Sequence, residues 1–359
     1  MYKKIGNGGN RYRYEGVGMY RFLVLFLVLR SLFTPVSADK GKLIQCAGTS
    51  SIVSSIYYEK DSVKDKACER ALEVERTAAK LYDFLKVSPK PFPLRVVEKS
   101  DEAAHEGDTL VLAGAPVLDG VKDSEMMREA TIVHEVGHHI IKEYLIKNVD
   151  FIREYDQFYK KRTLALKKWN EDYLPEYERL QRSGKSAEEA TDFMLSKHPS
   201  FENMLKELME INSRPEMDLV PYVWMPYHEL FADLVAVIFF KDLDVMFKAI
   251  HTEKTPEIKM KFYRPRSFSR ENKTEEIRGL NDPHTTLSPI RSYLGQLIKK
   301  NPTQGQQLEL LNRVRDIIVE EINYFYSKHV TSFQKMGNYK GKGLDITLMN
   351  MRILEKLED

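Results

Sequence analysis

The sequence predicts an α+β protein that is mostly helical and contains a small mixed sheet. Apolar residues recur at helical spacing in long segments, among them 62–87, 124–145 and 303–329. Two short β-type runs, 94–98 and 109–113, lie between the first two helical segments. With 359 residues and 42% hydrophobic content, the chain is long enough to bury one or two sizeable cores.

Residues 1–38 have the order of a secretory signal peptide. Basic residues precede a short apolar run from Phe22 to Leu29, and small residues end this segment at Ala38. The run is too short to span a bilayer as a stable helix. We therefore expect cleavage before Asp39 and a protein that is secreted or lies in the periplasm or cell envelope. An uncleaved anchor is the alternative, and membrane contact is expected only through such an uncleaved N-terminus.

Residues 39–90 are expected to form an N-terminal helical segment, whose helix ends before Ser88-Pro89. Cys46 and Cys68 both lie in this segment, and the chain has no other cysteine. In an oxidising compartment they would pair and close a short loop. Two free, buried thiols are the alternative.

The segment from Ser124 to Leu145 has an apolar helical face, no proline, and the pattern His134-Glu135-Val136-Gly137-His138. Two histidines four residues apart lie on one face of a helix, so both rings can reach one metal ion. The carboxylate between them lies about 100° round the helix, where it can take a proton from a water rather than bind the metal. A glycine inside the helix indicates close packing of another element. A surface helix that happens to carry two histidines is the alternative.

Residues 150–214 are charged and helical in pattern, with Trp169, Tyr173 and Tyr177 interleaved. We expect a helical insertion here. It could be a lid over a cleft or a solvated scaffold.

A catalytic zinc site needs a third protein ligand and one open position. Ile141 and Tyr144 stand where the Gly and His of an extended H-E-x-x-H-x-x-G-x-x-H motif would be, so the third ligand must come from elsewhere. Glu229 and Asp233 are one turn apart at the start of an apolar run. We expect Glu229 to bind the metal, and Asp233 to accept a hydrogen bond from the outer ring nitrogen of a ligand histidine.

Three alternatives remain for this second motif. Glu229 could be a first-turn carboxylate just after Pro226, placed by the helix dipole. His228 could be the ligand in its place. Asp233 could be the buried partner of a Lys or Arg.

The two motifs together, H134-E-V-G-H138 and E229-L-F-A-D233, resemble the gluzincin metallopeptidases. Within that group the chain is most similar to the branch that includes the heat-shock and prenyl-protein peptidases and their soluble secreted relatives. The resemblance implies a zincin-like catalytic domain over about residues 91–300, with zinc held by His134, His138 and Glu229. It also implies that Glu135 is the catalytic base.

That branch has an H-P-x-x-x-x-R segment after the third ligand. Here His284 is followed by threonine and Arg291 comes one residue late. The resemblance implies that His284 donates to the substrate carbonyl oxygen, with Arg291 placing it or pairing with a carboxylate. Tyr222 and Tyr227 are the alternative donors.

In such peptidases a strand before the active helix often forms the sheet edge that pairs with extended substrate. The run 109–113 is the candidate, by strand addition. An ordinary core strand is the alternative.

Residues 252–285 are expected to be a polar loop near the site, and residues 301–359 to be C-terminal helices. The formal net charge is only +2, with no basic segment typical of nucleic-acid binding. The sequence thus predicts a zinc-dependent endopeptidase with peptide or protein substrates. The alternative is a non-enzymatic envelope module that binds zinc or protein and keeps the peptidase fold.

Overall fold

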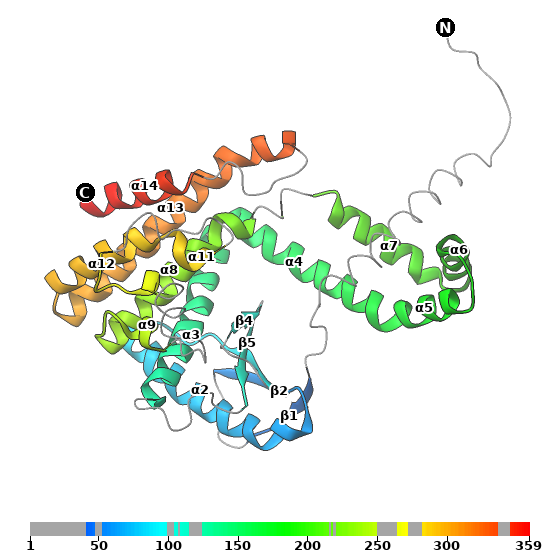
Figure 1. The fold of residues 1–359 in the computed structure, drawn as a ribbon, viewed down its shortest axis with the longest axis horizontal. Helices are drawn as coiled ribbons and strands as arrows, with labels where there is room; N and C mark the ends of the chain where they lie inside the picture. The colour runs from blue at the N-terminus through cyan, green and yellow to red at the C-terminus, as the bar shows by residue number, and fades with distance from the viewer. Residues whose placement is uncertain are drawn as a thin grey trace, which may run out of the picture. The chain divides into compact units, whose positions relative to one another are not determined.

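The computed structural model describes residues 41–46, 52–98, 104–106, 108–114, 124–214, 217, 220–249, 264–271, 282–336 and 345–359. The expected signal peptide lies outside these residues. The chain divides into two compact units, one containing Asp39–Arg153 with Asp218–Asp359 and the other containing Glu154–Met217. The fold is mostly helical with a small mixed sheet, as expected (Figure 1).

The sheet of the first unit has five strands among the described residues, in the order β1-β2-β3-β5-β4. The strands are β1 (Lys42–Ile44), β2 (Val53–Tyr58), β3 (Phe92–Val97), β4 (Ala104–Glu106) and β5 (Thr109–Ala113). β2, β3 and β5 are parallel, and β1 and β4 join their outer sides antiparallel. Alternate residues of β3 are buried, which is the pattern of a strand with one face on the core.

Two expectations about this sheet are wrong. Residues 39–90 are not purely helical, because they contribute β1 and β2. Residues 109–113 are not at the sheet edge, because β5 pairs with β3 on one side and with β4 on the other. Among the described residues, β4 rather than β5 forms this edge of the sheet. Its pairing depends on contacts between strands, which local alternation does not specify.

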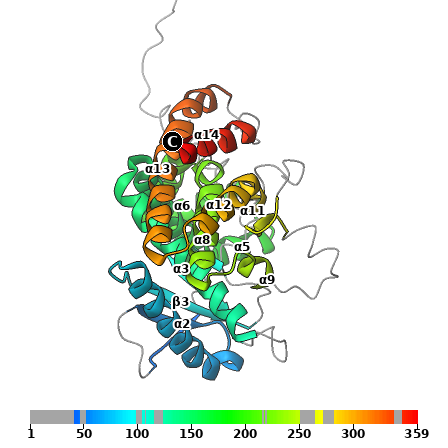
Figure 2. The ribbon, with the colours of Figure 1, turned by 90° about the vertical axis from the view of Figure 1, so that its left-hand side faces the viewer.

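Helix α2 (Lys64–Leu85) connects the parallel strands β2 and β3, as a crossover helix does in a βαβ unit. Its buried residues recur along one face, and that face packs on these strands and on α3 (Figure 2). Cys46 and Cys68 form a disulfide with a Cα–Cα distance of 5.4 Å. The bridge ties the segment after β1 to the first turns of α2, so the predicted pairing is confirmed.

Helices α3 (Ser124–Asn148) and α8 (Val220–Phe240) form the centre of this unit and make its most extensive helix–helix packing. A Cβ placed on Gly137 would lie 3.1 Å from the Cα of Ala232, so the two backbones approach each other closely at this point. The predicted close packing at Gly137 is confirmed. His134 and His138 are buried, which excludes the surface-helix alternative.

Of the other described helical elements of this unit, η1 (Asp61–Val63) packs on α2, and the rest pack on α3, on α8 or on one another. The rest are α9 (Val245–Ala249), η4 (Arg264–Arg266), α11 (Pro283–Thr286), α12 (Ser288–Lys300), α13 (Gln304–Met336) and α14 (Ile346–Glu358). In the described part of the chain, Val223–Phe240 within α8 is long and apolar enough to pass a test for a membrane span. Because 83% of that stretch is buried, it has the environment of a core helix.

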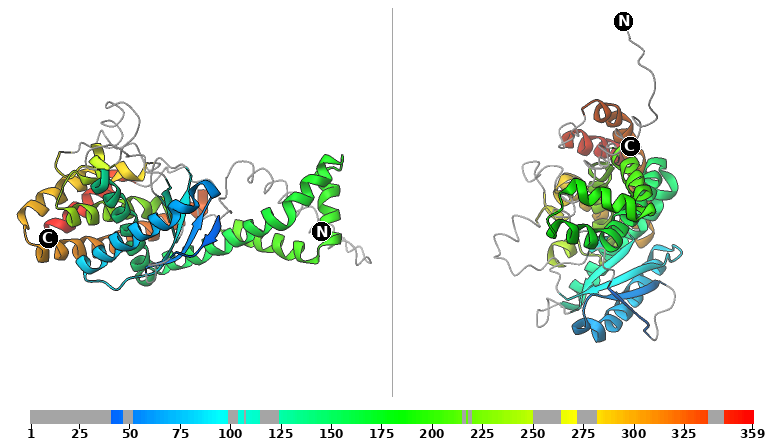
Figure 3. Two further views of the ribbon diagram at one scale, coloured as in Figure 1. Left: turned by 90° about the horizontal axis from the view of Figure 1, so that it is seen from below. Right: turned by 90° about the vertical axis from the view of Figure 1, so that its right-hand side faces the viewer.

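The second unit is the helical insertion. It comprises the later part of α4 (Asp150–Lys168), a π-helical stretch η2 (Trp169–Tyr173), α5 (Leu174–Arg182), α6 (Ala187–Lys197) and α7 (Pro199–Asn212) (Figure 3). The interleaved aromatics form its own core, with the Trp169 ring 5.8 Å from Tyr177 and 6.1 Å from Phe201. Ser186 and Glu189 form a capping box at the start of α6. A lid function for this unit stays a prediction.

Candidate metal centre

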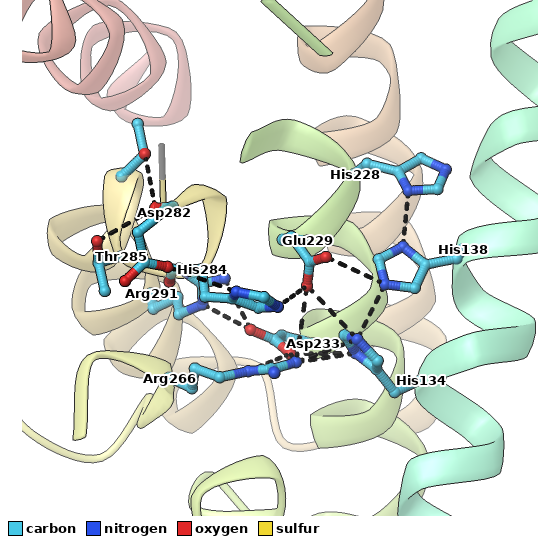
Figure 4. A network of polar contacts seen from close by, with 11 residues as sticks. His134, His138, His228, Glu229, Asp233, Arg266, Asp282, His284, Thr285 and Arg291 are labelled. Carbon is cyan, nitrogen blue, oxygen red and sulfur yellow. Dashed lines mark hydrogen bonds and ion pairs between the residues drawn. The ribbon is translucent and has the colours of Figure 1, made fainter. Parts of the chain in front are cut away.

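Three buried side chains from α3 and α8 converge on one point (Figure 4). The Nε2 atoms of His134 and His138 are 2.9 Å apart. The carboxylate of Glu229 lies 3.5 Å from the first of these nitrogens and 3.4 Å from the second. The structure therefore brings together the three residues that the sequence predicted as metal ligands.

The donor set fits a divalent metal ion. Oε2 of Glu229 is buried and makes no hydrogen bond with the described residues, although nitrogens of His284, His134 and Arg266 lie 3.3–3.7 Å from it. A bound cation would satisfy this oxygen. Burial opposes the ionisation of Glu229, but His284, His138 and His134 outweigh it and hold its pKa well below the usual range. Two imidazoles and one carboxylate leave a fourth position open, as catalytic zinc sites do.

Glu229 reaches this position from the interior of α8. The helix begins at Val220, so Glu229 is more than two turns from its start. The first-turn alternative is therefore wrong, and the helix dipole does not place this carboxylate. Pro226 lies inside the helix rather than at its beginning.

Glu135 is 6% exposed and is not part of the ligand triad. Burial raises the pKa of its carboxyl to about 7; Glu229 adds to this rise, while His134 and Arg266 oppose it. A carboxylate with a pKa near neutrality can both accept and return a proton at physiological pH. This is the property that the predicted catalytic base requires.

Asp233 is completely buried and has both of the partners that the sequence left as alternatives. Its Oδ1 lies 3.1 Å from Nδ1 of His134, so it is placed to orient that ring. Arg291 donates from Nε to Oδ2 at 2.8 Å, and Arg266 donates from Nη2 to Oδ1 at 2.5 Å. Burial opposes the ionisation of Asp233, but the two guanidinium groups hold its pKa well below the ordinary value.

Arg266 is a residue of this site that the sequence analysis missed. It belongs to η4 and is 6% exposed, and its Nη2 lies 3.1 Å from Nε2 of His134 and 3.7 Å from Oε2 of Glu229. The segment 252–285 was expected only to be a loop near the site. The available signal was the need of a buried aspartate for a cationic partner.

His228 orients His138 rather than joining the ligand triad. The two Nδ1 atoms are 2.7 Å apart, and the rings stack with centroids 4.5 Å apart. Burial and the neighbouring His138 hold the pKa of His228 well below its usual value, so its ring is neutral and one ring nitrogen accepts. When Nε2 of His138 faces the metal position, its Nδ1–H donates a hydrogen bond to Nδ1 of His228.

His284 reaches the site from α11. Its Nε2 is 3.3 Å from Oε2 of Glu229, and its side chain is 40% exposed, so it faces both the ligands and solvent. Arg291 donates from Nη1 to the backbone oxygen of His284 at 2.9 Å. Arg291 therefore both holds the backbone of His284 and pairs with a carboxylate, that of Asp233, and these are the two roles expected of it.

Of the two alternative donors, the side chain of Tyr227 is described, and it does not take this place. Tyr227 is completely buried, and the charged residues that act on it electrostatically are Glu321 and Arg352. These two residues belong to α13 and α14 and form an ion pair with each other. The side chain of Tyr222 lies outside the described residues.

No family model matches this chain, and neither a curated protein nor a solved structure matches it. The gluzincin resemblance therefore depends on the motif residues alone.

Proposed function

We propose that this protein is a zinc-dependent endopeptidase. The observation that supports this most directly is the meeting of His134, His138 and Glu229 from two helices, next to a buried Glu135 whose pKa is about 7. A structural zinc site is usually closed by four protein ligands and needs no such base. A zinc ion held by the triad would supply a Lewis acid that polarises a peptide carbonyl and acidifies a water molecule.

The side chains then share the proton transfers and charge stabilisation. Glu135 accepts a proton from the attacking water and returns it to the leaving amine. His284 donates to the carbonyl oxygen as negative charge develops there, and a donor of this kind is worth about 3–4 kcal/mol of barrier. The buried guanidinium of Arg266 adds positive charge near Oε2 of Glu229, the oxygen that His284 also faces. Asp233 and His228 hold the two ligand rings in the orientation and tautomer that metal binding needs.

The test combines metal analysis with digestion of a peptide library by the purified mature protein. We expect one zinc per chain and cleavage of internal peptide bonds. Glu135→Gln should keep the zinc and lose cleavage, because this residue acts on water and not on the metal. His139→Asn is a matched control, since His139 is a buried histidine of the same helix outside the triad.

Full activity of Glu135→Gln would refute the proposed mechanism. Stoichiometric zinc without cleavage of any peptide would instead identify a non-enzymatic zinc-binding protein.

We also propose that the mature protein is exported. The disulfide between Cys46 and Cys68 supports this, because structural disulfides form and persist mainly in oxidising compartments. Mass spectrometry of the protein from its own cells should find an N-terminus at or near Asp39 in the extracytoplasmic fraction. Intact residues 1–38 on soluble cytoplasmic protein would contradict the proposal.

A further inference from the structure

A cavity of about 720 Å³ lies in the first unit, away from the metal centre. It is lined from α2, α3, α8 and α13, and it shares no residue with the ligand triad. Ile140 and Glu143 line it from the face of α3 opposite to His134 and His138. Phe231 lines it from the face of α8 opposite to Glu229. The cavity and the metal centre therefore use opposite sides of the same two helices.

The interior of this cavity is apolar. Its most buried lining residues are Tyr82, Phe231 and Leu311, and its half-buried walls include Ile140 and Leu308. The volume falls within the range of about 300–1,000 Å³ that is usual for small-molecule sites. A peptide would have to leave its backbone amide groups without partners against such walls, which is costly. The lining favours a hydrocarbon chain instead.

The charged lining residues are mainly cationic. Lys90, Lys147 and Arg153 are exposed and Arg315 is half-buried, whereas Glu143 is the one acidic residue among those that line the cavity in the described chain.

Part of this positive charge is already compensated. Arg153 pairs with Asp150, and Arg315 pairs with Asp316 while stacking on Tyr144. The side chains of Lys90 and Lys147 form no ion pair with another described residue. The rim is thus positive and has two lysines available to an anion.

We propose that this cavity binds a free long-chain fatty acid. The hydrocarbon chain lies against Phe231, Leu311 and their neighbours, and the carboxylate lies at the rim near Lys90 and Lys147. An apolar body with a single negative end matches an apolar interior with a positive rim. This site does not depend on the proposed peptidase activity.

Calorimetric titration of the full mature protein with saturated fatty acids tests the proposal. Octanoate, decanoate and dodecanoate are titrated separately, each below its critical micelle concentration. We expect each of them to bind saturably at one site per chain. The Kd should fall about fourfold for each added methylene. Dodecylamine has the same chain length but the opposite charge, and it should bind about fivefold more weakly than dodecanoate or worse.

Variants locate the site. Lys90→Glu with Lys147→Glu should weaken dodecanoate binding about tenfold, and Leu308→Glu should weaken it by placing a charge on the apolar wall. Lys299→Glu is the matched control, because Lys299 is an exposed lysine of α12 outside the cavity, and it should bind as the wild type does. The zinc content of all these variants should equal that of the wild type, which separates this result from the fate of the metal centre.

Several results would overturn the proposal. They are the absence of saturable binding, binding of dodecylamine as tight as that of dodecanoate, and an unchanged affinity of the lysine double variant for dodecanoate. The two lysine substitutions are at the surface and should not prevent folding.

Discussion

The buried carboxyl of Glu135 should make the stability of the metal-free protein depend on pH. Its pKa is raised from 4.5 to about 7 by burial in the folded chain. Between these values the folded state keeps a proton that the unfolded state releases, so the free energy of unfolding must decrease as the pH rises. Replacing Glu135 with glutamine removes this proton equilibrium while keeping the shape of the side chain.

The magnitude follows from the shift. Linkage with pKa values of 4.5 and about 7 gives a loss of about 2.5 kcal/mol between pH 5 and pH 8. The wild type should lose this much more stability over that interval than Glu135→Gln does. Other titrating groups, such as His134, are present in both proteins and largely cancel in the comparison. Zinc must be removed first, because a bound cation would stabilise the ionised carboxylate.

The measurement is urea unfolding of both proteins at pH 5 and pH 8 after treatment with EDTA, followed by circular dichroism. Glu125→Gln is the control, since Glu125 is an exposed carboxyl near the start of the same helix. It should change with pH as the wild type does. If the wild type and Glu135→Gln differ by less than about 1 kcal/mol between the two pH values, Glu135 does not have the environment described here.

Four further outcomes are expected. Replacing any of the three ligand residues with alanine should abolish stoichiometric zinc in metal analysis, whereas His139→Asn should keep it. His228→Ala should weaken zinc binding about 10–100-fold in competition with a chromogenic chelator, and His228→Asn, whose amide oxygen can accept the same hydrogen bond, should restore part of the loss. Reducing the bridge between Cys46 and Cys68, which are 22 residues apart, should lower the free energy of unfolding by about 3 kcal/mol in urea titrations. His284→Ala should lower kcat and kcat/KM together at normal zinc content, and an unchanged kcat would refute its role as a donor.

Much of the candidate metal centre could be predicted from local patterns in the sequence. The spacing of His134 and His138 fixes their common face once the segment is a helix, because the helical repeat is 3.6 residues. The apolar run after Glu229 indicated a buried helix, and burial required partners for Asp233. Both inferences use short-range periodicity and the cost of burying charge, which a single sequence contains.

The tertiary structure decided which distant residues complete these groups. Arg266 and His228 contact the ligand histidines across 132 and 90 residues of chain. No local pattern marks such contacts. The assignment of β5 to the interior of the sheet, and of β1 and β2 to the same sheet, depended likewise on pairing between separate strands. Periodicity specifies which face of an element is buried, but which partner meets that face depends on how the whole chain packs.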